Sequence, residues 1–346
     1  MSCDLGNVYR EYLAVPASGR DELLGGWVTS LRNFSAPGSL ADVRQMLLPM
    51  IRARGESSIA KTRSNAGDAT MVERPFSEDL VLAIVVDRPD LVTRIHDVEL
   101  RRWDVDEEAV YGMALHNLRL RSADAWKKVA RNVYASDWHD AFDVTRVVFT
   151  DLLRRVPIEG EPVVMTPNRD CLLLTSARDP EGLSEMVEVA IGQYDDRPHA
   201  LSIQPLVLRE DIWRPFDVGG DAMREVRQRL LAARADEYQQ QAKAFEDQDA
   251  VFFASLMQDI REGDGLGTTA AWPYGVPTLL PKCDTLGVFR SETEMYRVLW
   301  SDAESIVDGL DEPEPGLWPP RYRVGVPTDS QFASLKAAGE TFKAPS

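Results

Sequence analysis

The first 55 residues carry apolar side chains at helical spacing. Leu24, Trp27 and Leu31 recur at three- or four-residue steps, and Ser39 is placed to cap a second helix that runs towards residue 54. These patterns predict a helical preamble over residues 1–55. Residues 55–70 are polar and small without periodicity, so we expect an exposed loop there.

The clearest pattern in the chain is an apolar run, a Pro-x-x-Asp turn and a second apolar run. Residues 163–166 and 171–176 flank Asp170 in this way, and a helical segment follows at 182–194. Residues 200–208 then alternate apolar and polar positions, as a half-buried strand does. Together these segments predict a β-β-α-β unit.

Two further stretches suggest the same unit. Residues 276–290 repeat the two apolar runs around a Pro-x-x-Asp turn, and a predicted helix at 291–310 and a strand at 322–326 follow. Residues 80–138 fit the plan more loosely, with two strands, a helix and a closing strand at 133–138. We therefore expect β-β-α-β units to repeat along the chain.

A long charged segment lies between the two clear hairpins. From Met223 to Phe245 its apolar residues recur at mostly three- or four-residue steps, which predicts one long amphipathic helix. It would link the central region to the C-terminal unit, or serve as a partner-binding helix. The predicted class is α+β: a preamble at 1–55, an α+β domain at 56–216, the linking helix at 217–250 and a C-terminal β-β-α-β module at 251–346.

Composition narrows the class of protein. The chain has 346 residues, 44% of them hydrophobic, which suffices for the cores of two or three modest domains. No apolar run approaches the roughly 18 residues that span a bilayer, and the N-terminal residues lack the basic and then apolar pattern of a signal peptide. We therefore expect a cytoplasmic protein that does not enter a membrane.

Charge and cysteine content exclude further classes. A formal net charge of -17 opposes the basic surface that nucleic-acid binding requires. Three cysteines are too few for a disulfide framework. Cys171 and Cys283 both lie at Pro-x-x-Asp turns, which suggests a redox pair, although a small buried thiol in a strand is the simpler interpretation.

A series of landmarks between residues 45 and 216 carries a family resemblance. They are the Leu-Pro-Met-Ile-Arg run at 48–52, Val86-Asp87, Trp103 with an acidic helix start behind it, the segment 114–120, Asp143-x-x-Arg146 and Pro167-x-x-Asp170. In order and spacing this region resembles the YtpQ-like bacterial proteins of unknown function. The resemblance implies a cytoplasmic bacterial α+β domain and no particular reaction.

The chain also departs from that family. Its members end soon after the strand that residues 200–208 match, so the long helix and everything beyond it look like an added module. The stretch Trp138-His139-Asp140 differs from the Asn/Gly-rich turn expected before Asp143. The family resemblance therefore gives no support to a functional role for His139.

One group of residues is a candidate catalytic site. HExxH, GxSxG and GxxxxGK[ST] motifs are missing from the sequence, and we expect no metal or cofactor. Asp143, Arg146 and Asp170 would bind a metal or a polar ligand if they converged in a cleft, because a guanidinium would then flank two carboxylates. Helix capping and turn stabilisation are the simpler roles for the same residues.

A second group of residues is a candidate binding surface. Residues 301–315 contain six acidic residues and no basic one, so they form either a solvated helix end or a surface for a basic partner. Trp272 and Tyr274 belong to an aromatic rim that would anchor a contact or pack loops onto a sheet. The acidic candidates are Asp302, Glu304, Asp308, Asp311 and Glu312.

The sequence thus favours a cytoplasmic adaptor or scaffold that binds another protein, with a basic surface as one option for that partner. Missing catalytic motifs, small sheets, a long amphipathic helix and a concentrated acidic segment motivate this hypothesis. Two alternatives stay open. One is a hydrolase-like or metal-dependent enzyme that uses the Asp/Arg cleft, and the other is an acidic immunity-type protein that neutralises a basic target.

Overall fold

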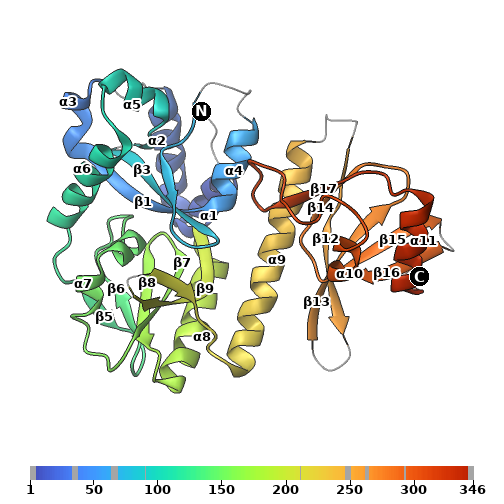
Figure 1. Cartoon of the computed structure of the whole chain (residues 1–346). Helices are drawn as coiled ribbons and strands as arrows, with labels where there is room; N and C mark the ends of the chain where they lie inside the picture. The colour runs from blue at the N-terminus through green and yellow to red at the C-terminus, as the bar shows by residue number, and fades with distance from the viewer. Residues whose placement is uncertain are drawn as a thin grey trace. The chain divides into compact units, whose positions relative to one another are not determined.

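The chain forms two compact units, coloured by residue number in Figure 1. The computed structural model describes residues 5–32, 38–63, 69–89, 91–210, 212–245, 251–261, 265–291 and 294–341. Unit 1 comprises residues 1–57 and 66–226, and unit 2 comprises residues 58–65 and 227–346. Both units combine helices with mainly antiparallel sheets, which confirms the predicted α+β class.

Unit 1 holds two sheets and most of the helices. Its elements in chain order are α1 (Leu5–Ala14), η1 (Ala17–Gly19), α2 (Arg20–Arg32), α3 (Leu40–Val43), η2 (Arg44–Met46), β1 (Leu47–Ala53), β2 (Glu73–Pro75), β3 (Leu80–Arg88), β4 (Leu91–Arg94), α5 (Asp97–Trp103), α6 (Glu107–Leu120), β5 (Trp126–Lys128), β6 (Tyr134–Ser136), η3 (Val144–Val148), α7 (Thr150–Leu153), β7 (Pro162–Asn168), β8 (Cys171–Ser176), α8 (Pro180–Asp196), β9 (Ala200–Arg209) and β10 (Ile212–Pro215). Helices α4 (Arg54–Arg63) and α9 (Gly220–Ala244) cross the boundaries between the units.

The clearest predicted unit is present as β7, β8, α8 and β9. Strands β7 and β8 form an antiparallel hairpin, and β9 pairs with the other edge of β7 in a six-stranded sheet of order β10-β9-β7-β8-β6-β5. Asp179 caps α8 by accepting a hydrogen bond from the Gly182 amide, and Pro180 occupies the first turn. Helix α8 packs along this sheet (Figure 1).

The N-terminal region is less helical than the sequence predicts. Residues 47–53 form strand β1, which pairs antiparallel with β3 along its whole length, so the predicted helix towards residue 54 is wrong there. The run Leu-Leu-Pro-Met-Ile is apolar on both faces, as a buried strand requires, and Leu47, Leu48 and Ile51 are buried. The loop expected at 55–70 is a helix, α4, up to Arg63; residues 64–68 lie outside the described residues.

The two sheets of unit 1 share a hydrophobic core. Ile51 and Leu80 of the four-stranded sheet pack in one cluster with Leu172 and Leu206 of the six-stranded sheet. The cluster also includes Val144 at the start of η3. The looser repeat predicted over residues 80–138 is wrong in its last step, because β6 pairs with β8 in the other sheet and not with β3 or β4.

Unit 2 builds its own core between two small sheets. Its elements are β11 (Phe252–Phe253), β12 (Leu256–Arg261), β13 (Gly265–Pro273), β14 (Thr278–Pro281), β15 (Thr285–Ser291), β16 (Glu294–Leu299), α10 (Trp300–Glu304), β17 (Arg321–Val324), α11 (Asp329–Ala338) and β18 (Glu340–Thr341). The sheet orders are β11-β14-β17 and β12-β13-β15-β16-β18. The final strand expected near residues 322–326 is β17.

The repeat predicted for residues 276–290 is wrong. Strand β14 pairs with β11 and β17, whereas β15 pairs with β13 and β16, so the Pro-x-x-Asp turn joins two different sheets and no hairpin forms. The helix predicted at 291–310 is also wrong for residues 294–299, which form β16. Alternate burial of Tyr296 and Val298 shows that this stretch has a period of two and not of 3.6.

Helix α9 is the long helix that the sequence predicts, and it is continuous over 25 residues. The predicted range extended to residue 250, and residues 246–250 lie outside the described residues. The buried guanidinium of Arg321 ties α9 to the sheet of β14 and β17, since it donates to Tyr238 O on the helix and to Leu279 O on β14. None of the described helices has the length and hydrophobicity of a membrane-spanning helix.

Candidate functional site

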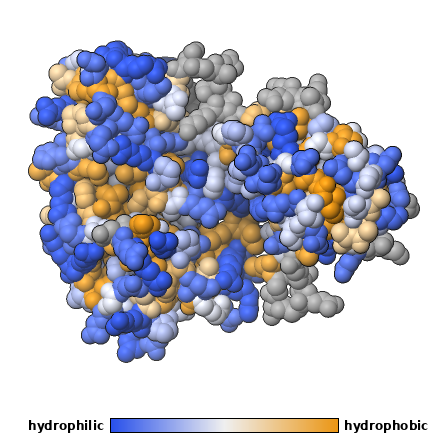
Figure 2. All heavy atoms as spheres, in the orientation of Figure 1, coloured by the Kyte–Doolittle hydropathy of each residue, from blue (hydrophilic) through white to orange (hydrophobic). Residues whose placement is uncertain are grey.

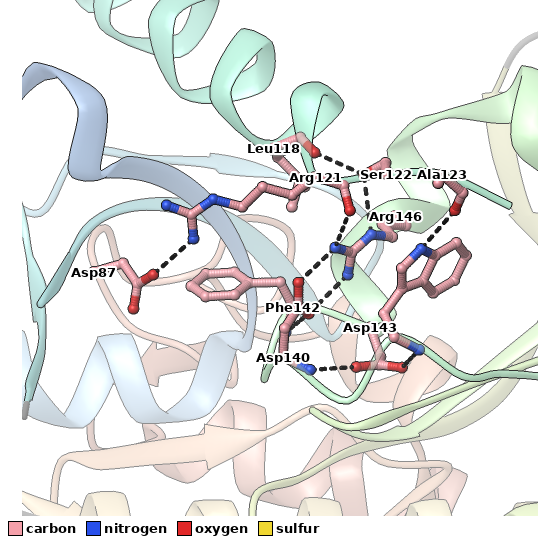
Figure 3. A network of polar contacts seen from close by, with 10 residues as sticks. Asp87, Leu118, Arg121, Ser122, Ala123, Asp140, Phe142, Asp143 and Arg146 are labelled. Carbon is pink, nitrogen blue, oxygen red and sulfur yellow. Dashed lines mark hydrogen bonds and ion pairs between the residues drawn. The ribbon is translucent and has the colours of Figure 1, made fainter. Parts of the chain in front are cut away.

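Arg146 lies at the centre of a polar network between the end of α6 and helix η3 (Figure 3). Its side chain is 0% exposed. The guanidinium makes a bidentate ion pair with Asp140, with Nη1 to Oδ1 at 2.8 Å and Nη2 to Oδ2 at 2.6 Å. Nε also donates to Ser122 Oγ at 3.0 Å, and Nη2 donates to the backbone oxygen of Arg121 at 3.1 Å.

The turn before η3 places Asp140 opposite this guanidinium. His139 and Ala141 on either side of Asp140 have φ angles of 56° and 66°, the left-handed region that folds the chain sharply back. The Asp140 carboxylate also accepts a hydrogen bond from the Phe142 amide. The Trp138 ring stacks on the guanidinium of Arg146, whose central carbon lies 4.6 Å from a Trp138 ring centroid.

Asp143 is buried and serves the same turn. Its Oδ1 accepts from the Trp138 amide at 3.1 Å, and its Oδ2 accepts from the Asp140 amide at 3.3 Å. It therefore closes the turn through backbone amides, while the ion pair with Arg146 belongs to Asp140. The sequence pointed to Asp143 through the Asp143-x-x-Arg146 landmark, and nothing in the pattern singled out Asp140 as the partner of Arg146.

Asp170 lies apart from this network. Its carboxylate is 43% exposed and pairs with its neighbour Arg169 at 3.2 Å. Asn168 makes the turn contact there, because its side-chain oxygen accepts from the Asp170 amide. The structure therefore places Asp143 and Arg146 in one buried network and leaves Asp170 on the hairpin turn between β7 and β8.

The electrostatics of this network are those of a structural ion pair. Burial opposes ionisation of Asp140, but the hydrogen bonds and charge of Arg146 hold its pKa below the ordinary value. Nearby Cys171 is buried, and this raises its pKa to about 12, so the thiol stays protonated. Within the described ranges, no three His, Cys, Asp or Glu side chains lie together as a metal-binding group.

The acidic segment of unit 2 is folded against the core. Its apolar residues Ala303, Val307 and Leu310 are buried in the same cluster as the sheets. Gly309 has a φ of 91°, and a side chain there would collide with the backbone oxygen of Arg323 on β17. Apart from Glu314, the segment has five carboxylates, of which four are exposed and one is half-buried: Glu304, Asp308, Asp311, Glu312 and, half-buried, Asp302.

These five acidic side chains make no ion pair with any described residue. Glu314 of the same segment differs from them, because its Oε2 atom pairs with Nε of Arg323 at 2.8 Å. We name the five side chains Asp302, Glu304, Asp308, Asp311 and Glu312 the acidic ridge. The buried residues between them hold the backbone that carries these charges.

The two aromatic candidates behave differently. Trp272 is 1% exposed and lies in the core of unit 2, so its ring is not available to a partner and the expected contact through it is wrong. Tyr274 is half-buried, donates to Asp329 at 3.0 Å, and has the guanidinium of Arg290 over its ring at 4.0 Å. Its phenol is therefore committed to contacts within unit 2.

Comparison with known proteins yields two similar proteins of different kinds. A UPF0354 protein from Halalkalibacterium halodurans is 26% identical over 170 residues, which are 48% of this chain and 62% of that protein. The chain thus spans less than two thirds of that relative's length. A dephospho-CoA kinase from Rhizobium meliloti is 27% identical over 136 residues, 38% of this chain and 68% of the kinase.

No protein-family model matches the chain, and no solved structure matches it. The kinase similarity is not accompanied by the Gly-x4-Gly-Lys-Ser/Thr loop that commonly holds the phosphates of a nucleoside triphosphate, because no Gly-Lys pair occurs in the sequence. The narrower YtpQ-like assignment stays a prediction. The chain is similar to an uncharacterised bacterial protein family, UPF0354, over about half of its length.

Proposed function

We propose that this protein binds another protein through the acidic ridge of unit 2, and that the partner presents a basic surface. The observation that supports the proposal is the set of five carboxylates on a folded segment without ion pairs to described residues. Opposite charges that meet at an interface raise the association rate and select the partner. Because Ala303, Val307 and Leu310 anchor the segment, its backbone loses little freedom when a partner binds.

The enzyme hypothesis gains less support from the same structure. A catalytic carboxylate or guanidinium must reach a substrate, whereas Arg146 is wholly buried and makes four hydrogen bonds within unit 1. Asp143 is equally buried and binds two backbone amides. These residues therefore stabilise a turn, and we place the proposed binding surface on unit 2.

Other surfaces of unit 1 are mixed in character. Figure 2 shows hydrophobic side chains gathered in patches among hydrophilic ones over this unit. Leu120 and Ile212 are examples of strongly exposed apolar residues. A single exposed apolar residue is ordinary on a folded protein, so neither Leu120 nor Ile212 by itself marks an interaction site, and the proposal is placed on the charged ridge.

A charge-reversal experiment tests the proposal. The ridge variant carries Asp308→Lys, Asp311→Lys and Glu312→Lys, and the control variant carries Glu188→Lys, Asp196→Lys and Glu210→Lys, which are exposed acidic residues of unit 1. Both triple variants change the net charge equally. Proteins captured from the native host's lysate by the tagged wild type at low salt are identified by mass spectrometry, purified and titrated against all three chains.

The proposal expects a basic protein that binds the wild type and the control alike. The ridge variant should bind it at least tenfold more weakly, since each lost or reversed charge pair at an interface costs a sizeable part of the affinity. The affinity of the wild type should also fall as salt rises. Equal binding by the ridge variant and the wild type would contradict the proposal.

A further inference from the structure

An aromatic pair lies beside the acidic ridge of unit 2. Trp300 is the first residue of α10, and Tyr322 lies on β17. Their ring centroids are 5.0 Å apart and their planes make an angle of 73°, so the two rings meet edge to face. Trp300 is 5% exposed and Tyr322 is half-buried. The pair therefore lies where the core of unit 2 meets its surface.

The chain covers this pair with a cation of its own. The Nζ atom of Lys282 lies 4.1 Å from the centroid of the Trp300 ring and 5.3 Å from that of the Tyr322 ring. Both distances are within the roughly 6 Å over which an aromatic face attracts a cation. Lys282 is exposed, and its ammonium makes no ion pair with any described residue. The two rings, and not a carboxylate, therefore position this ammonium.

The backbone that carries Lys282 is fixed more firmly than its side chain. Lys282 belongs to the Pro-x-x-Asp turn that ends at Asp284. The backbone oxygen of Asp284 accepts from the Trp300 amide at 3.0 Å, and its carboxylate accepts from the Thr268 amide at 2.7 Å. A cation–π contact at an exposed position is weak. Another ammonium can therefore replace that of Lys282 on the rings while the turn stays folded.

The ridge supplies negative charge at the same place. Trp300 and Glu304 are four positions apart on α10, which places them on one side of the helix. Burial and the nearby charge of Glu304 raise the pKa of the Tyr322 phenol. The Glu304 carboxylate is exposed. A cation on the two rings is therefore also attracted by a carboxylate of the ridge.

We propose that Trp300 and Tyr322 form a cation site next to the acidic ridge, and that a lysine side chain of the basic partner displaces Lys282 from it. A lysine fits this site because the chain's own occupant is a lysine. Lys282 then acts as a competitor that keeps the rings covered in the free protein and weakens partner binding. This inference rests on the proposed function and specifies how the ridge recognises its partner.

A deca-lysine peptide tests the site without the partner. The peptide is titrated at low salt into the full chain, and its affinity is measured by calorimetry. The indole N–H signal of Trp300, identified by its loss in Trp300→Phe, is followed by NMR. The test variant is Lys282→Ala. The control is Lys336→Ala, which removes the same charge from over another ring, that of Tyr296 at 5.2 Å, where Lys336 also pairs with Glu294.

The cation site predicts that the peptide shifts the Trp300 signal of the wild type. Lys282→Ala should bind the peptide about two- to fivefold more tightly, which is the size of one exposed cation–π contact, and Lys336→Ala should stay close to the wild type. In the Lys282→Ala background, Tyr322→Phe keeps a ring face and should retain this gain, whereas Tyr322→Leu should lose it. Equal affinities of the two lysine variants, or a Trp300 signal that the peptide does not move, would overturn the inference.

The inference and the proposed function fail in different ways. A captured partner that binds the ridge variant and the wild type equally contradicts the proposed function, and no peptide is needed to see it. A peptide that binds the wild type more tightly than the ridge variant, but leaves the Trp300 signal unchanged, shows that the ridge attracts cations without the aromatic pair. That result would overturn the cation site alone.

Discussion

Replacement of Arg146 by methionine should destabilise unit 1 without touching the acidic ridge. The substitution removes two charge-assisted hydrogen bonds to Asp140, one to Ser122 Oγ and one to the oxygen of Arg121. Removing one partner of a buried ion pair costs about 3–5 kcal/mol, because the remaining charge and acceptors lose their partners. The half-buried state of Asp140, which is 32% exposed, points to the lower end of that range.

The loss should be visible in the melting temperature. For a unit of roughly 150–250 residues, 1 kcal/mol corresponds to about 2–4 °C, so we expect unit 1 to melt about 6–12 °C lower at neutral pH. Differential scanning calorimetry gives the temperature, and urea unfolding gives the free energy of unfolding. Asp140→Asn removes the other partner of the same ion pair. The double variant Asp140→Asn/Arg146→Met should lose less free energy of unfolding than the two single variants lose together.

The same pair predicts a pH dependence. Because the pKa of Asp140 is lowered in the folded protein, the ion pair stabilises the fold above the ordinary carboxyl pKa of 3.8 and loses this effect as the pH falls below it. The difference in stability between the wild type and Arg146→Met should therefore shrink as the pH falls from 5 towards 3. A melting temperature within 2 °C of the wild type at pH 7 would refute the structural role of this network.

Two further predictions concern unit 2 and the thiols. Gly309→Ala should lower the free energy of unfolding of unit 2 by several kcal/mol, because the new Cβ collides with the backbone oxygen of Arg323. Gly316→Ala is the control: its φ is 80°, but the new Cβ meets open space, so the loss should be only about 1 kcal/mol. Thermal unfolding measures both losses. Burial raises the pKa of Cys171 and of Cys283 to about 12, so a thiol reagent at pH 8 should label neither until denaturant is added; fast labelling of native protein would contradict their burial.

Sequence patterns predicted well those elements whose structure is set locally. The hairpin at β7 and β8 follows from two apolar runs around a short turn, and the helix predicted at 182–194 lies within α8, which begins two residues earlier, at Pro180. The long helix α9 follows from its own periodicity. In each case the residues that determine the element lie within it or next to it.

Strand pairing between distant segments was not predictable in the same way. The two apolar runs around Asp284 resemble a hairpin, but β14 and β15 join different sheets. The turn is held by Thr268 of β13, whose backbone amide and hydroxyl both donate to Asp284, and Thr268 is 16 positions away. The pattern of apolar residues shows which segments form strands, but it does not show which strands pair with each other.

The candidate site shows the same limit at the scale of side chains. Asp143 and Arg146 were identified as important, and both are buried in one network. Their pairing was not predictable, because the left-handed turn at His139 and Ala141 brings Asp140 to the guanidinium. Neither residue is a glycine, the residue type that adopts left-handed angles most readily, so the sequence did not predict this turn.

If unit 2 binds a basic partner through the acidic ridge, the partner must cover residues of the segment that carries the ridge. The most direct measurement is hydrogen exchange of the whole chain with and without the purified partner from the capture experiment. We predict added protection in peptides that cover residues 300–314, and little change around Asp140 and Arg146. Protection confined to the Arg146 network, or to any surface that excludes residues 300–314, would contradict the account.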